Sequence, residues 1–159
     1  MSNALLEQAI SLAWKARAEG NRPFGSLITD PEGKIVARGV NSAVTSGDVT
    51  AHSETNAVRA ALSAAGQRGP APLTGHTLYS SAEPCMMCTG ALYLAGISRV
   101  VYALGSAELE ALAGPAPGVR TLPFSLDIAL HAGDGNTVAD YVPLPAARDV
   151  HHDYWKESR

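Results

Sequence analysis

Two short motifs in this chain carry residue types that can bind a metal and move protons. They are His52-Ser53-Glu54 and Pro84-Cys85-Met86-Met87-Cys88. Imidazole nitrogens and thiolates are preferred zinc ligands, and three protein ligands leave a tetrahedral zinc with the open position of a catalytic site. The carboxylate of Glu54 is not needed for the metal, so it can act as acid and base. The motifs predict one zinc ion held by His52, Cys85 and Cys88, with Glu54 as the catalytic group.

Two other interpretations of these motifs stay open. A C-x-x-C pair is also typical of a redox-active dithiol, although a dithiol needs no upstream histidine. A structural zinc site would need a fourth ligand, and His76 is the nearest candidate in the sequence. Such a zinc-stabilised interaction module would give Glu54 no role. The occurrence of both motifs together favours the catalytic zinc.

Composition limits the class of protein. The 159 residues, 46% of them hydrophobic, fit one domain, 1–159, with its own core. A net charge of −3 offers no basic surface for nucleic acid. Both cysteines lie in the C-x-x-C, so a secreted disulfide scaffold is disfavoured. The N-terminus does not resemble a signal peptide, and no apolar stretch reaches transmembrane length. We expect a cytoplasmic protein with neither a membrane nor a nucleic acid as partner.

Hydrophobic periodicity and turn residues predict alternating helices and strands. The expected helices are 3–19, 51–65, 85–95, 107–113, 125–131 and 145–157. The expected strands are 24–30, 34–40, 76–81, 99–104 and 136–142, with loops at 41–50, 66–75 and 114–123. A hairpin pairs antiparallel and a strand–helix–strand crossover pairs parallel. The expected fold is therefore α/β, a mixed sheet with helices on both faces.

These elements bring the chemical groups together at two helix starts. Residues three apart share a helix face, so Cys85 and Cys88 can reach one ion. The partial positive charge at a helix N-terminus favours thiolates there. His52 and Glu54 are two residues apart and point in different directions. That arrangement suits one metal ligand and one proton carrier.

At these residues the chain resembles the cytidine/deoxycytidylate deaminase superfamily, and within it the bacterial guanine deaminases and related nucleobase deaminases. The resemblance runs from residue 5 to residue 105, and its matching segments are 22–25, 39–41, 48–54 and 78–91. It implies a three-layer α/β/α sandwich with a five-stranded mixed sheet. It also implies one Zn²⁺ per chain on His52, Cys85 and Cys88, and hydrolytic loss of an amino group with Glu54 as the proton shuttle.

The resemblance also implies a set of substrate contacts. These are Phe24, Asn41, Ala51, Glu108, Glu110, Tyr154 and Trp155. Asn41 would hydrogen-bond the substrate ring and Phe24 would form an apolar wall, although a turn role and ordinary core packing stay open for them. Glu110, or else Glu108, would accept hydrogen bonds from the guanine edge, but glutamates on a short helix also fit a solvated face. The aromatic tail at 145–159 would cap the pocket.

The reaction implied first is guanine to xanthine plus ammonia, in a homodimer that can exchange its tails. Alternatives are another aminopurine, a cytosine-like aminopyrimidine, an aminotriazine or a nucleoside. Deamination of tRNA adenosine is disfavoured because the last nine residues are not basic. Segment 120–124 is similar to the guanine-type enzymes, whereas Leu94 and segment 113–117 depart from them. The pattern assigns no role to His151 and His152.

Overall fold

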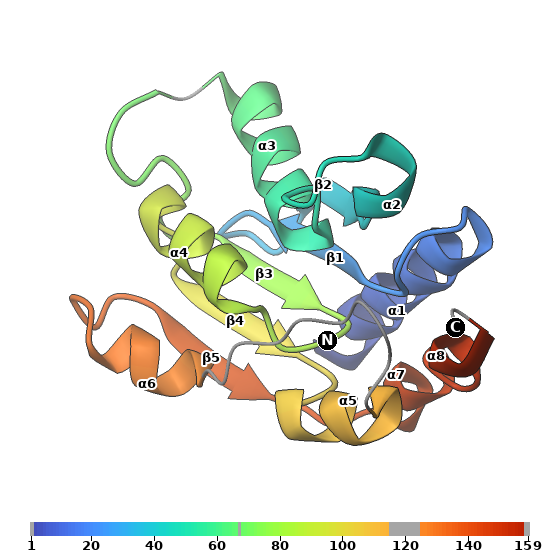
Figure 1. Ribbon diagram of the computed structural model, residues 1–159. Coiled ribbons are helices and arrows are strands. Elements are labelled where there is room, and N and C mark those ends of the chain that lie inside the picture. The colour runs from blue at the N-terminus through green and yellow to red at the C-terminus, as the bar shows by residue number, and fades with distance from the viewer. Residues whose placement is uncertain (1, 67, 115–124, 158–159) are drawn as a thin grey trace.

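A mixed β-sheet forms the centre of the molecule in the computed structural model, which describes residues 2–66, 68–114 and 125–157 (Figure 1). Its strands are β1 (Gly25–Thr29), β2 (Ile35–Val40), β3 (Thr77–Ser80), β4 (Arg99–Tyr102) and β5 (Val138–Tyr141). The order across the sheet is β2-β1-β3-β4-β5. β1 is antiparallel to β2 and β3, while β3, β4 and β5 are parallel. The hairpin and the parallel crossovers are both as predicted.

Helices cover both faces of this sheet (Figure 1). They are α1 (Ser2–Ala18), α2 (Ala43–Ser46), α3 (Ser53–Ala65), α4 (Met86–Ala95), α5 (Ser106–Ala113), α6 (Leu126–His131), α7 (Pro145–Asp149) and α8 (Tyr154–Glu157). Among the described residues, no helix is both long enough and apolar enough to cross a membrane.

Strand periodicity divides the core into two layers. Successive side chains on a strand point to opposite faces. Ile28, Leu78 and Val100 pack with buried side chains of α3, α4 and α6. Their neighbours Leu27, Tyr79 and Val101 pack with side chains of α1, α5 and α7. The three-layer α/β/α sandwich and its five-stranded mixed sheet are thereby confirmed.

Two glycines let helices approach the sheet closely. A Cβ at Gly39 on β2 would lie 1.9 Å from the carbonyl oxygen of Ser53, at the start of α3. A Cβ at Gly25 on β1 would lie 2.4 Å from the carbonyl oxygen of Ala9 in α1. Only glycine fits at such distances. Gly39 therefore sets the height of the first turn of α3, which carries Glu54, above the sheet.

The structure corrects three predicted boundaries. The predicted loop at 41–50 contains the short helix α2. The predicted terminal helix at 145–157 is broken into α7 and α8, because Asp153 has a φ of 61° and a left-handed residue cannot continue a right-handed helix. Pro84 precedes α4 rather than opening it, since Cys85 is the N-cap residue. Segment 120–124 lies outside the described residues.

Candidate metal centre and active site

The three predicted metal ligands lie together at the starts of α3 and α4. His52 is the N-cap of α3, Cys85 is the N-cap of α4, and Cys88 lies in the first turn of α4. Their ligand atoms all lie within 4.8 Å of one another. The spacing predicted from the two motifs is thus realised in three dimensions.

The distances between these atoms fit a tetrahedral zinc. His52 Nδ1 is 3.6 Å from Cys85 Sγ and 3.5 Å from Cys88 Sγ. Zinc bonds of ordinary length at a tetrahedral angle would separate a sulfur and a nitrogen ligand by about 3.6 Å. The three residues can therefore hold one zinc ion without rearrangement. His76 is not in this group, so no fourth ligand for a structural site is found among the described residues.

Side-chain hydroxyls fix the two loops that carry the ligands. Thr55 Oγ1 donates to the carbonyl oxygens of Thr50 at 2.6 Å and His52 at 3.0 Å. Thr89 Oγ1 donates to the carbonyl oxygen of Cys85 at 2.9 Å. Each threonine lies one turn into its helix and binds the chain just before it. The ligand loops are thereby preorganised by the helices that follow them.

The three ligands shift one another's pKa values. A hydrogen bond from Cys88 lowers the pKa of Cys85 to about 4. The same hydrogen bond, together with burial, raises the pKa of Cys88. The hydrogen bond with Cys85 raises the pKa of His52. The first thiolate is thus formed readily, whereas the other two ligands retain their protons more strongly.

Glu54 lies beside the ligands but does not belong to their group. Its side chain is only 6% exposed, and its Oε2 accepts a hydrogen bond of 2.9 Å from Ser53 Oγ. Burial raises the pKa of the Glu54 carboxyl. A hydrogen bond with Glu54 is also one cause of the raised pKa of Cys88. A carboxyl with raised proton affinity next to a metal position can both accept and return a proton.

Three of the predicted substrate contacts adjoin the ligand loop. Asn41 and Ala51 are buried. Asn41 Oδ1 accepts from the backbone of Ala43, and the backbone N–H of Asn41 donates to the carbonyl of Phe24. The carbonyl of Ala51, next to His52, accepts from the backbone of Ser42. Backbone hydrogen bonds therefore link Phe24, Asn41 and Ala51 into one wall, and Ala51 directly precedes the ligand His52.

The C-terminal tail meets this wall at Phe24. The Phe24 ring lies 5.2 Å from that of His151 and 6.4 Å from that of Trp155, centroid to centroid. Tyr154 packs edge-on against Trp155. Arg17 of α1 holds the tail by donating to the carbonyls of Val150 and His152. The tail thus lies against a predicted pocket residue of the same chain.

The two candidate acidic residues differ in their surroundings. Glu108 accepts hydrogen bonds from the hydroxyl of Tyr141 and, at 2.8 Å, from Arg148. It therefore links α5 to β5 and α7. Glu110 lies on the exposed face of α5. Neither residue belongs to the group of metal ligands, and their substrate roles stay predictions, as do those of Phe24, Asn41, Ala51, Tyr154 and Trp155.

The sequence interpretation missed a set of buried serines behind Glu54. Ser26 on β1, Ser53 on α3 and Ser80 on β3 are each at most 1% exposed. Small polar residues inside apolar strand segments were the available signal for Ser26 and Ser80. Nothing in the local pattern indicated that they meet Ser53.

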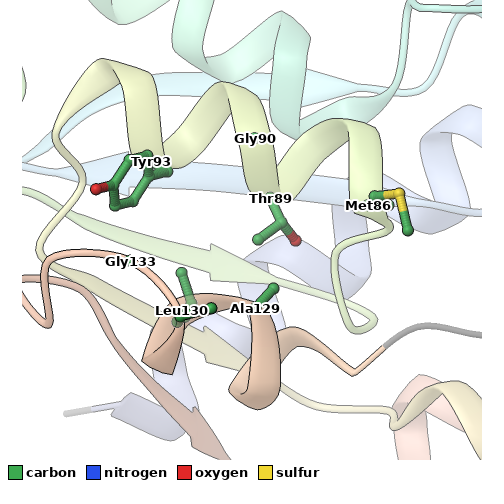
Figure 2. Close-up of a pocket in the computed structure, with 8 residues that line it drawn as sticks. Met86, Thr89, Gly90, Tyr93, Ala129, Leu130 and Gly133 are labelled. Carbon is green, nitrogen blue, oxygen red and sulfur yellow. The ribbon is translucent and has the colours of Figure 1, made fainter.

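A separate pocket lies between α4 and α6 (Figure 2). Its volume is about 420 Å³. It is lined by Met86, Thr89, Gly90, Tyr93, Ala129, Leu130, Ala132 and Gly133. None of the predicted ligands or substrate contacts lines it, so the pocket is distinct from the metal centre.

The family of the chain follows from comparison with known proteins. The family model for the cytidine and deoxycytidylate deaminase zinc-binding region matches residues 1–104. This match includes both motifs, and the chain belongs to that family of zinc-dependent deaminases. The cofactor of the site is accordingly zinc.

Individual relatives act on different bases. A probable cytosine deaminase of Schizosaccharomyces pombe is 41% identical over 106 residues, which cover 67% of this chain and 62% of that protein. Guanine deaminase of Bacillus subtilis is 41% identical over 99 residues, which cover 62% of this chain and 61% of that protein. The chain thus matches about three fifths of the length of each of these relatives.

Solved structures extend the likeness over most of the chain. The crystal structure of the Bacillus subtilis guanine deaminase is 31% identical with a TM-score of 0.63, covering 82% of this chain and 89% of that one. A mutant protein solved in complex with 8-azaguanine is 26% identical with a TM-score of 0.80, covering 97% and 84%. The fold of the whole described chain is therefore that of the deaminases.

Proposed function

We propose that this protein catalyses the zinc-dependent hydrolytic deamination of a free nucleobase, with guanine as the first candidate substrate and xanthine and ammonia as products. The observation that carries the proposal is the position of Glu54. Its buried carboxylate lies beside His52, Cys85 and Cys88 and is not one of the metal-binding group. An interaction module with a structural zinc would have no use for such a group.

Glu54 is the proton carrier in this proposal. Zinc held by His52, Cys85 and Cys88 would supply Lewis-acid activation of a water molecule. Glu54 accepts a proton from the attacking water and passes it to a ring nitrogen of the base, while the water oxygen bonds to the ring carbon that carries the amino group. Glu54 then moves the second proton of the water to that amino group, the bond between the amino nitrogen and the ring carbon breaks, and ammonia leaves with the oxygen retained on the ring. Asn41 and Ala51 orient the base, and Phe24 forms the apolar wall against it.

Guanine is the first candidate because guanine deaminase of Bacillus subtilis is among both the sequence relatives and the similar solved structures. An 8-azaguanine complex is among the similar structures, at 97% coverage of this chain. Since Glu108 is bound to Tyr141 and Arg148, Glu110 is the better candidate acceptor for the adjacent N1–H and 2-amino donors of guanine. Cytosine is the second candidate, because the Schizosaccharomyces pombe relative is 41% identical. Other aminopurines, aminotriazines and nucleosides belong in the same assay.

The test is to replace Glu54 and follow ammonia release from a panel of amino-heterocycles. Glu54→Ala should keep one zinc per chain and the fold, and should release no ammonia. The exposed Glu32→Ala serves as the control and should match the wild type. Turnover by Glu54→Ala would refute the mechanism, and loss of zinc would identify Glu54 as a ligand. If guanine is inert while cytosine is deaminated, the second candidate replaces the first.

We also propose that this single domain acts as a homodimer in the cytoplasm. Support for the dimer comes from exposed apolar side chains on α4 and α6. Met86, Tyr93, Leu94 and Ile128 are 47%, 37%, 77% and 72% exposed. Exposed apolar side chains gathered on neighbouring helices are a feature of many protein interfaces. A reducing compartment would keep both cysteines available as thiolates for zinc.

A further inference from the structure

A buried chain of hydroxyl groups connects Glu54 to the central sheet. Ser53 Oγ donates to Glu54 Oε2 at 2.9 Å. Ser53 Oγ also lies 2.9 Å from Ser26 Oγ, which in turn lies 3.1 Å from Ser80 Oγ. The chain therefore passes from α3 through β1 to β3.

The environment of these hydroxyls is closed to solvent. Ser26 and Ser53 are 0% exposed and Ser80 is 1% exposed. A hydroxyl transferred into such an interior without a partner costs about 1–3 kcal/mol. An alanine of nearly the same size would avoid that cost at each position. Ordinary packing therefore does not account for three serines here.

The backbone holds this chain of hydroxyls in register. Ser26 pairs directly with Ser80 across β1 and β3, and with Gly39 across β1 and β2. The absence of a side chain at Gly39 lets the backbone of Ser53 come against the sheet. Ser53 is thus fixed by two rigid strands, and its hydroxyl reaches the carboxylate of the adjacent residue.

From this arrangement we propose that Ser53 is a positioning residue for the reaction: its hydroxyl, held in close contact with Ser26 of the sheet, fixes the orientation of the Glu54 carboxylate. The inference rests on the proposed role of Glu54 as proton carrier. The last torsion of a glutamate side chain is broadly distributed, so burial alone does not orient the carboxylate. Proton transfer requires the carboxylate oxygen within hydrogen-bond reach of its partners. A misplacement of about 1 Å can cost about a hundredfold in rate.

A hydroxyl is chemically suited to this place. It can donate to a carboxylate oxygen, and it can accept from a carboxyl group that holds a proton. Glu54 passes through both forms in the proposed cycle. An amide or ammonium donor has no acceptor on the same atom and would oppose the protonated form. Ser53 can support Glu54 before and after the proton moves.

The experiment compares Ser53→Ala and Ser26→Ala with a matched control, Ser81→Ala. Ser81 is 0% exposed, and its hydroxyl accepts from the backbone of Gly25 rather than binding the chain of serines. The assay uses guanine, or cytosine if the wild type deaminates only cytosine. It is combined with zinc content, thermal unfolding and calorimetric binding of the xanthine or uracil product.

Ser53→Ala should lower kcat about tenfold, the effect of losing one hydrogen bond to a charged group, while KM, product binding and zinc content stay within twofold of the wild type. Ser26→Ala keeps the bond between Ser53 and Glu54 but removes its anchor, so kcat should fall about threefold. Ser81→Ala should lower the melting temperature and leave kcat unchanged. If Ser53→Ala does not fold, the kcat of Ser26→Ala serves as the test of the inference instead.

Two results would overturn the inference. One is a wild-type kcat in a folded Ser53→Ala protein, or in Ser26→Ala if the first does not fold. The other is a fall in kcat that Ser81→Ala reproduces, because that would reflect general destabilisation. A Glu54→Ala protein that still deaminates would overturn the proposed function and this inference with it. An inactive Glu54→Ala beside a fully active Ser53→Ala overturns the inference alone.

Discussion

His52, Cys85 and Cys88 determine one another's protonation. The pKa of Cys85 is lowered to about 4 by its hydrogen bond from Cys88. The pKa values of Cys88 and His52 are raised by hydrogen bonds with Cys85. Zinc binds thiolates and a neutral imidazole, so it must displace the protons that Cys88 and His52 retain. Metal binding and proton release are therefore coupled at this site.

The coupling predicts that zinc affinity falls as pH falls. At least one proton leaves for each zinc bound near neutral pH, so affinity at pH 6 should be at least about tenfold lower than at pH 7. Competition with a chromophoric chelator across this range measures the change. Cys85→Ser removes one of the three zinc ligands, so this variant should bind zinc more weakly. An affinity independent of pH would contradict the shared-proton arrangement.

At the scale of elements, the glycine at 39 determines how α3 sits on the sheet. Gly39→Ala would place a Cβ 1.9 Å from the Ser53 carbonyl and 2.6 Å from the Ala57 nitrogen. Both atoms are backbone, so α3 must move as a unit. We expect a loss of about 3 kcal/mol or more in the free energy of unfolding and weaker zinc binding, because overpacking a tight contact displaces the backbone.

Thermal and denaturant unfolding, with zinc titration, measure this effect. Gly33→Ala is the control, because a Cβ at Gly33 meets no atom within 4 Å. Its positive φ of 83° predicts only a modest loss from backbone strain. Equal stability losses in the two variants would show that the close approach of α3 does not limit the fold.

The turn between α7 and α8 buries a histidine. His151 is 2% exposed, and neither ring nitrogen has a hydrogen-bond partner among the residues that the structure describes. Burial, with a smaller effect of Arg17, lowers the pKa of His151 to about 4. The unfolded chain binds a proton near the ordinary pKa of 6.5. Between pH 6.5 and pH 4 the unfolded chain therefore binds more protons than the folded protein does. The free energy of unfolding consequently falls as the pH is lowered from 7 towards 4.

His151→Phe should flatten this part of the pH profile. The phenyl ring can pack against Phe24 and Trp155 without an unpaired polar atom. The wild type should lose about 3 kcal/mol more than the variant between pH 7 and pH 4, since one pKa unit corresponds to 1.36 kcal/mol. Denaturant unfolding at several pH values measures the difference. Parallel curves for the wild type and His151→Phe would contradict the assignment to His151.

The sequence predicted the zinc ligands well because their spacing encodes helix starts and their atoms are unambiguous. The pairing directions of the strands followed from a hairpin and a strand–helix–strand crossover, whereas the order of the strands across the sheet was not predicted. The break between α7 and α8 could not be predicted, since it depends on the left-handed Asp153 and on Arg17 holding the tail. The choice between Glu108 and Glu110 depends on Tyr141 and Arg148, which are distant in the chain. Features that short motifs encode were predictable, whereas those that depend on contacts between segments without a motif were not.

For the whole molecule, the exposed apolar side chains on α4 and α6 are the feature that supports the proposed homodimer. Tyr93 of α4 lines the pocket between these helices (Figure 2), and Leu94 of α4 and Ile128 of α6 are exposed on the same two helices. α4 also carries Cys85 at its N-cap and Cys88 in its first turn. A dimer formed through α4 would therefore add contacts to the element that holds two zinc ligands.

The homodimer proposal predicts a solution mass of twice the 16.5 kDa of one chain. Leu94→Glu would place a charge in the apolar interface, where it would lack both water and a partner, so the variant should sediment as a monomer. Val49→Glu is the control, because Val49 is exposed to a similar extent and belongs to neither α4 nor α6. Analytical ultracentrifugation of the zinc-loaded proteins distinguishes these outcomes. A monomeric wild type would refute the dimer, and a dimeric Leu94→Glu would move its interface away from α4. If the dimer supports the metal site through α4, the Leu94→Glu monomer should also release zinc more readily to a chelator than Val49→Glu does.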